Sequence, residues 1–185
     1  MPEDFDNGDD GSERNGPPLT SVTVSNGTIG EGAFRGLSTL RSVTLGKGVT
    51  EIGTDAFSGT GITSIRIPSS VKIIDGFSNC KALASVELSE GLTVIGSVAF
   101  MDCTALREIT LPATLEFIGG DSFGYDKGAF MGCTSLSTVN IPEDSKLGTW
   151  GGWGSQKGIM LGTFNRAPLN LATQARLRKF GYTHE

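Results

Sequence analysis

A repeated pattern of roughly 22 residues restricts the fold of this chain more than any other feature. Five tandem copies begin at Ile29, Ile52, Ile74, Ile95 and Ile118, with lengths of 23, 22, 21, 23 and 30 residues. The fifth copy carries about seven extra residues around Tyr125, and residues 19–24 match the second half of a unit. A fixed period of this size is typical of solenoids, in which each unit buries its apolar faces only against its neighbours.

Each unit combines a short strand with a return segment. In the fourth unit, Ile109 and Leu111 alternate with polar residues, which predicts a strand over 108–111. Pro112 ends this strand because proline has no N–H group to donate to a ladder. Stacking would place equivalent residues roughly 4.8 Å apart. We therefore expect two buried columns, Phe34, Phe57, Phe77, Phe100 and Phe130, and Val43, Ile65, Val86, Ile109 and Val139.

The unit Ile-Gly-x-x-Ala-Phe-x-x-Cys-x-x-Leu-x-x-Val-x-Leu-Pro-x-x-Leu resembles the leucine-rich repeats of the BspA-like, or Treponema pallidum, type. The resemblance covers roughly residues 19–147 and implies a β-rich solenoid, a right-handed leucine-rich repeat coil of about six short parallel strands. It also implies a surface or secreted protein, because repeats of this type occur in surface and secreted proteins of gut and oral bacteria and of some protists. Several members are similar to adhesins. The third unit departs from the pattern at Ile74-Asp-Gly-Phe77, and Leu37 and Thr60 stand where Cys is usual.

The two ends of the chain lie outside the repeats. Residues 1–18 contain six acidic residues and one basic residue, which account for the whole net charge of −5. This segment has one large apolar side chain, so we expect a disordered acidic tail or linker. Residues 148–185 are expected to form an irregular and helical C-terminal cap. Within them, residues 170–179 read as a helix with Asn170 as its N-cap, lying over the last open coil.

No residue pattern in the chain indicates an active site, a metal site or a cofactor. The single histidine, His184, is the penultimate residue, where a catalytic or zinc-binding side chain would be held poorly. Cys80, Cys103 and Cys133 recur at one repeat position and lack a C-x-x-C pair. We interpret them as a column of small buried residues, with a disulfide or thiolate metal site as the alternative.

The charge distribution limits the classes of partner. Beyond residue 18 the chain holds 14 acidic and 14 basic residues, so nothing favours nucleic acid or an anionic membrane. The sequence contains no run of about 20 apolar residues, so we expect no direct membrane insertion. No secretion signal is recognisable, which leaves two alternatives: a cytoplasmic protein, or an extracellular or cell-surface protein whose signal is absent from this chain. We expect a monomer.

The outward side of the predicted strands is the candidate binding surface, because solenoids commonly bind partners on such a face. Trp150, Trp153 and Tyr125 would supply aromatic anchors at one end, although the tryptophans could instead pack as a lid on the last coil. We predict a non-catalytic, adhesin-like module that recognises a protein or a glycan; the alternative is a structural or scaffolding segment without a ligand of its own. The candidate contacts are Thr44, Arg66, Glu87, Glu108, Thr110, Asn140, Tyr125, Trp150 and Trp153.

Overall fold

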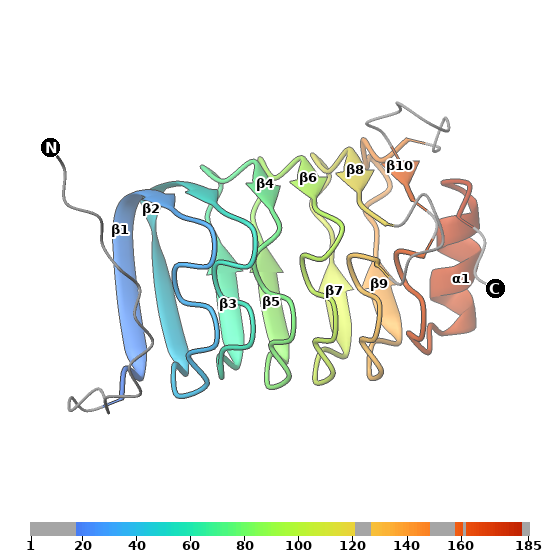
Figure 1. The fold of residues 1–185 in the computed structure, drawn as a ribbon. Helices are drawn as coiled ribbons and strands as arrows, with labels where there is room; N and C mark the ends of the chain where they lie inside the picture. The colour runs from blue at the N-terminus through green and yellow to red at the C-terminus, as the bar shows by residue number, and fades with distance from the viewer. Residues whose placement is uncertain (1–17, 121–126, 149–157, 161, 183–185) are drawn as a thin grey trace, which may run out of the picture.

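The computed structural model describes residues 18–120, 127–148, 158–160 and 162–182. Stacked coils form a solenoid whose strands lie in two rows, one along each side of the interior (Figure 1). The first row consists of β1 (Ser21–Ile29), β2 (Ser42–Ile52), β3 (Ser64–Ile67), β5 (Ser85–Leu88), β7 (Glu108–Thr110) and β9 (Thr138–Asn140). The second row consists of the ends of β1 and β2 with β4 (Ile73–Ile74), β6 (Val94–Ile95), β8 (Phe117–Ile118) and β10 (Gly158–Ile159).

The β-rich solenoid of short parallel strands is confirmed, but the second row of strands was not anticipated. It forms one six-stranded parallel sheet in the order β1-β2-β4-β6-β8-β10. The isoleucine that opens each unit lies in this sheet, where Ile74 pairs with Ile95 and Ile95 with Ile118. These side chains are buried, so the return segment contributes both a ladder and part of the core.

Strands β1 and β2 are longer than the other strands because they pass through the corner between the two rows. Pro68 and Pro112 follow β3 and β7 and stop them, whereas β2 continues through Gly46-Lys47-Gly48. The β1–β2 register shifts between Val24 and Asn26 and again between Gly27 and Thr28. Gly27 has a φ of 87°, a conformation that glycine adopts without steric cost. Two irregularities in the ladder thus let one strand serve both rows.

A stack of aromatic rings runs along the interior and confirms the expected phenylalanine column. Neighbouring rings lie nearly parallel, with centroids 5.2 Å apart for Phe34–Phe57 and 5.7 Å apart for Phe77–Phe100. Phe164 extends the stack beyond the fifth unit, 5.2 Å from Phe130, and the ring of Tyr182 meets it edge-on at 5.4 Å. Every ring from Phe57 to Phe164 is fully buried, so the stack is a continuous core along the solenoid.

The glycine after the unit-opening isoleucine permits the close approach of successive coils. A Cβ atom on Gly53 would lie 2.7 Å from the backbone nitrogen of Glu31, and one on Gly119 would lie 2.6 Å from that of Ser97. The third unit carries Asp75 at this place, and its carboxylate accepts a hydrogen bond of 3.0 Å from the Val98 N–H group. In the third unit, a hydrogen bond between the Asp75 side chain and the next coil therefore takes the place of the close backbone contact that glycine permits in the other units.

The predicted C-terminal helix is α1 (Leu171–Arg178), which lies at one end of the solenoid (Figure 1). The Asn170 side chain accepts a hydrogen bond of 2.8 Å from the Thr173 N–H group and caps the helix as expected. Gly181 follows with a φ of 77°. None of the helices in the described part of the chain is long and apolar enough to span a membrane.

Candidate binding surface

The strand face, which we define as the outward side of residues 21–24 of β1, residues 42–45 of β2, and β3, β5, β7 and β9, carries the candidate contacts in register. Arg66 lies opposite Glu87, and Thr110 lies opposite Asn140. Thr44 lies opposite Thr23 at the N-terminal end of the same column. Since Ile65 and Ile109 beside them point into the core, alternation along each strand directs these polar side chains outward. Thr44, Arg66, Glu87, Glu108, Thr110 and Asn140 are all exposed.

The ladder beneath the strand face is divided into three pairs of strands. β1 pairs with β2, β3 with β5, and β7 with β9, and no ladder joins one pair to the next in the described chain. A hollow of about 330 Å³ lies at the division between β5 and β7, lined by Glu87, Glu90, Thr110 and neighbouring apolar residues. The strand face is thus interrupted by a hollow between β5 and β7.

Two direct side-chain contacts connect residues of the strand face. The Arg66 guanidinium lies 3.4 Å from a carboxylate oxygen of Glu87, with 73% and 60% of the two side chains exposed. Salt screens a pair this exposed, which contributes little to folding. The Asn140 amide donates a hydrogen bond of 3.3 Å to the Thr110 hydroxyl. Both contacts leave polar groups accessible to a partner.

A hollow of about 380 Å³ lies where β9 meets α1. Thr110 and Asn140 from the strand face line it together with Asn170, Thr173 and Arg176. The sequence pattern assigned Asn170 to a helix cap, and it did not indicate that Asn170 and Arg176 border the strand face. Only docking of α1 against β9 brings them there, because the residues are about 30 positions apart in the sequence.

Tyr125, Trp150 and Trp153, proposed as aromatic anchors, lie outside the described residues, as does His184. Nothing in the described structure tests their roles. Within the described chain, no group of His, Cys, Asp or Glu side chains is arranged to hold a metal ion.

The three cysteines form the buried column that the repeat spacing predicts, and each is a free thiol. The Sγ atom of Cys80 donates to the Phe57 carbonyl oxygen at 3.1 Å, and Cys103 repeats this bond to Phe77 at 3.2 Å. Burial raises the pKa of all three thiols, and the pKa of Cys133 reaches about 12. A neutral thiol that bonds the preceding coil is a structural group, not a nucleophile.

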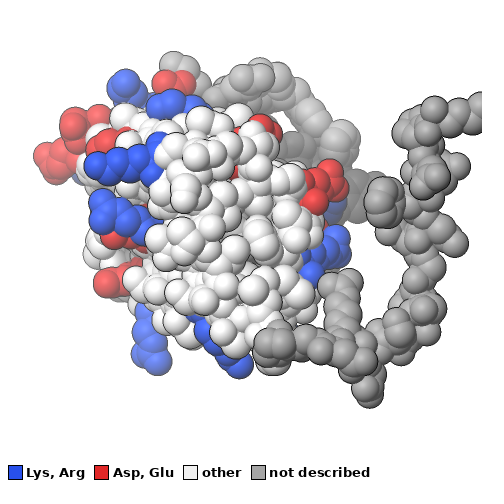
Figure 2. Space-filling view, turned by 90° about the vertical axis from the view of Figure 1, so that its left-hand side faces the viewer, with Lys and Arg blue, Asp and Glu red and all other residues white. Residues whose placement is uncertain are grey.

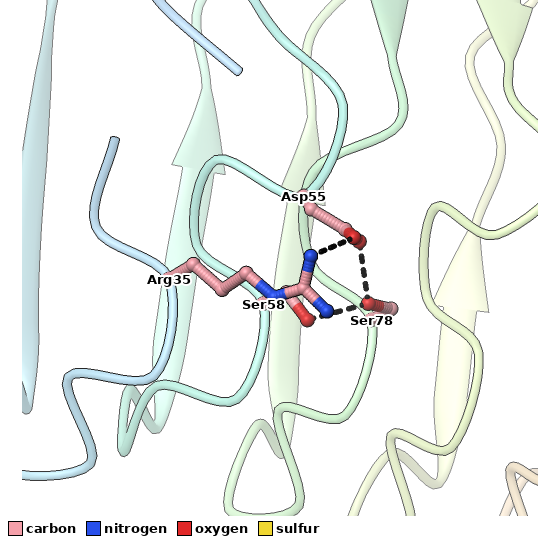
Figure 3. A network of polar contacts seen from close by, with 4 residues as sticks. All are labelled: Arg35, Asp55, Ser58 and Ser78. Atoms are coloured by element: carbon pink, nitrogen blue, oxygen red, sulfur yellow. Dashed lines mark hydrogen bonds and ion pairs between the residues drawn. The ribbon is translucent and has the colours of Figure 1, made fainter. Parts of the chain in front are cut away.

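The return segments carry a separate polar cluster, drawn in Figure 3. Arg35 lies 3.1 Å from a carboxylate oxygen of Asp55, and the Ser78 hydroxyl donates to the other oxygen at 2.9 Å. The hydroxyls of Ser58 and Ser78 are 2.8 Å apart. Asp55 has a φ of 56° and takes part in contacts to the coils on both sides. The cluster joins three consecutive coils, and its groups already have partners, so we assign it to stability.

A third hollow, of about 460 Å³, lies on the side of the six-stranded sheet. It surrounds Ile73, whose side chain is among the most exposed large apolar ones described, with Lys72 and Asp75 beside it. Burial, more than any other influence, raises the pKa of Asp75. This hollow shares no residue with the strand face and contains none of the predicted contacts.

Comparison with known proteins gives a consistent result. The model of the BspA type leucine rich repeat region matches residues 14–128 in six copies. A leucine rich cell surface protein from Faecalibacterium prausnitzii A2-165 is similar at 28% identity and a TM-score of 0.58 over 66% of this chain. The chain spans 32% of that protein. The leucine rich repeat protein of T. pallidum matches at 22% identity and a TM-score of 0.60, over 91% of this chain and 86% of its own. No curated protein matches.

Proposed function

This chain belongs to the BspA-type leucine-rich repeat family, and from that membership we propose that it is a non-catalytic binding module of the bacterial cell surface. Its strand face recognises a protein or a glycan, in the manner of an adhesin. The observation that carries this proposal is the exposed polar column from Thr44 to Asn140, which is held in register above a buried core. The cell-surface description of the Faecalibacterium protein supports the location.

Docking of a partner on this face costs this protein little conformational entropy, because the stack of rings behind the strands already holds them in place. The face presents hydroxyl, amide and charged groups rather than a large apolar area. Such groups suit the hydroxyls of a sugar or the polar surface of a protein. The hollows beside Glu87 and beside Asn140 lie along this column and would receive parts of the ligand that project from it.

A binding screen followed by two matched triple variants tests the proposal. The purified chain is applied to a glycan array and to a panel of extracellular matrix proteins. Any ligand found is then titrated against Arg66→Ser, Glu87→Ser and Glu108→Ser combined. The control combines Lys81→Ser, Glu31→Ser and Glu51→Ser, which are exposed away from the strand face and change the net charge equally.

We expect the strand-face variant to weaken binding at least tenfold, and the control variant to bind as the unchanged chain does. The melting temperature of both should stay close to that of the unchanged chain, because all six residues are exposed. Loss of binding only in the control variant would mean that the partner binds elsewhere and that the strand face is not the binding surface. Failure to bind anything on either array would favour the scaffolding alternative.

A further inference from the structure

The outer edge of β1 has hydrogen-bonding groups that the described chain leaves unused. The Thr20 carbonyl accepts hydrogen bonds from Arg41 and Ser42, so the backbone groups of Thr20 face β2. Alternation along a parallel strand then directs those of Ser21 and Thr23 away from β2. β1 is the last strand of its sheet, and no hydrogen bond within the described residues reaches the outward groups of Ser21 or Thr23.

Two of the devices that usually prevent strand pairing, charged residues and proline, are missing from β1. β1 is nine residues long and contains neither a charged residue nor a proline. Natural edge strands are normally short, or interrupted by lysine, proline or a covering segment. Figure 2 views this end of the solenoid and shows Lys, Arg, Asp and Glu side chains around its margin, with an uncharged area between them.

The same end exposes apolar side chains that are buried in the interior coils. Leu19 is 44% exposed, and Val22 and Phe34 are only half buried. The counterparts of Leu19 and Phe34 in the next coil, Leu40 and Phe57, are fully buried. A partner that continues the sheet would therefore cover apolar surface as well as satisfy backbone groups.

We propose that the β1 edge pairs antiparallel with the β1 edge of a second copy of this chain, about a two-fold axis. A two-fold interface brings one patch against itself, and an uncharged patch does so without like-charge repulsion. With Val22 on the axis, Ser21 of each copy lies opposite Thr23 of the second copy, and each pair exchanges two hydrogen bonds. The two solenoids then share one continuous sheet.

Sedimentation velocity of the full chain across a concentration series tests this association. Thr23→Pro removes an outward N–H group that has no partner within the described chain, and proline is tolerated at such edge positions. Thr23→Ala removes the same side chain but keeps the N–H group, and serves as the control. We expect the unchanged chain and Thr23→Ala to form a dimer, and Thr23→Pro to weaken that dimer at least tenfold.

A cross-link tests the register independently of the proline variant. Val22 faces Val22 of the second copy as a non-hydrogen-bonded pair, whose short Cα separation suits a disulfide. Val22→Cys should give a covalent dimer under mild oxidation, whereas Ser64→Cys, exposed in the middle of the strand face, should stay monomeric. The three native thiols are buried and do not compete.

Three results would overturn the proposal. One is a chain that stays monomeric up to millimolar concentration and gives no cross-link at Val22→Cys. Another is a dimer that Thr23→Pro leaves unchanged, because the contact would then lie elsewhere. The third is a chain that dimerises only after residues 1–17 are removed, since the edge would then belong to the chain's own N-terminal segment.

Discussion

The two ends of the solenoid differ in how their last coil is finished. At the C-terminal end, α1 satisfies the outer edge of β9: the Thr173 hydroxyl accepts from the Val139 N–H group at 3.1 Å, and Arg176 donates to the Ile141 and Pro142 carbonyls at 3.2 and 2.8 Å. At the N-terminal end, the outward groups of β1 have no such partners within the described chain. Side chains of α1 close one end, whereas the described residues leave the other end as a strand edge.

The aromatic stack shows the same difference. Phe164 is fully buried beneath the ring of Tyr182, whose hydroxyl accepts a hydrogen bond of 3.3 Å from the Phe164 N–H group. Phe34, at the other end of the stack, is only partly buried. Because each repeat is stabilised by its neighbours, a terminal coil is weaker unless something replaces the missing neighbour. Among the described residues, a non-repeating segment replaces it at the C-terminal end only.

The largest expected effect on stability comes from removing single rings from the aromatic stack, and its size should differ between the two ends. Phe164→Ala should lower the free energy of unfolding by about 3–5 kcal/mol, as should Phe100→Ala in the middle, because each leaves a cavity among buried rings. Phe34→Ala should cost only about 1 kcal/mol, since part of its ring is already exposed. Urea unfolding measures all three.

Equal costs for Phe34→Ala and Phe164→Ala would mean that the N-terminal end is as well covered as the C-terminal end. A cost below about 1 kcal/mol for Phe100→Ala would instead mean that the stacking register is wrong.

The second effect isolates the side chains that close β9. Arg176→Met keeps the apolar stem but removes the charged hydrogen bonds to two carbonyls, and Thr173→Val leaves a buried N–H group without an acceptor. Each change should cost about 1–3 kcal/mol in urea unfolding. Arg178→Met on the exposed side of the same helix is the control, and it should cost less than about 0.5 kcal/mol. Similar costs for Arg176→Met and Arg178→Met would show that the bonds to β9 do not stabilise the cap.

The third effect tests whether the interior between the two ends excludes water. The pKa of Cys133 is about 12 in the folded chain, above the value of about 8.5 for an exposed thiol. The folded state therefore holds this proton at pH values where the unfolded state releases it. The contribution of this one thiol to stability should be complete below about pH 8.5 and then fall by up to about 1.4 kcal/mol per pH unit towards pH 12.

Urea unfolding at several pH values between 8 and 11 measures this dependence. Cys133→Ala removes one titrating thiol, so its stability should fall less steeply with pH than that of the unchanged chain. Identical slopes would show that the thiol is open to solvent in the folded state.

The smallest effect is expected from removing residues 1–17. This acidic segment has too little apolar surface to offset the entropy of ordering, so its deletion should leave the melting temperature nearly unchanged. Calorimetry of the shortened chain provides the measurement. A fall of many degrees would mean that residues 1–17 cap the N-terminal coil, and the two ends of the solenoid would then both be covered.

Much of the candidate site was predictable because a repeat carries its own register. Arg66 and Glu87 occupy the same position in successive repeat units, as do Thr110 and Asn140, and this was sufficient to place each pair side by side. The hollow beside Asn140 was not predictable, since its far wall comes from Asn170 and Arg176 on a helix outside the repeat. The division of the ladder between β5 and β7 was also unforeseen, because the strand pattern is the same on both sides of it.

The sequence by itself determined the solenoid, its register and its interior columns, in which Val86 and Phe34 are only partly buried, because a periodic pattern of apolar residues can be buried only when equivalent positions stack. It also determined the helix at the C-terminal end through a cap residue and a terminal glycine. Only the tertiary structure decided that the return segments form a second sheet, and that α1 closes one end while the outward groups of β1 have no partner within the described residues. Those outcomes depend on hydrogen bonds between segments far apart in the chain, which no local pattern records.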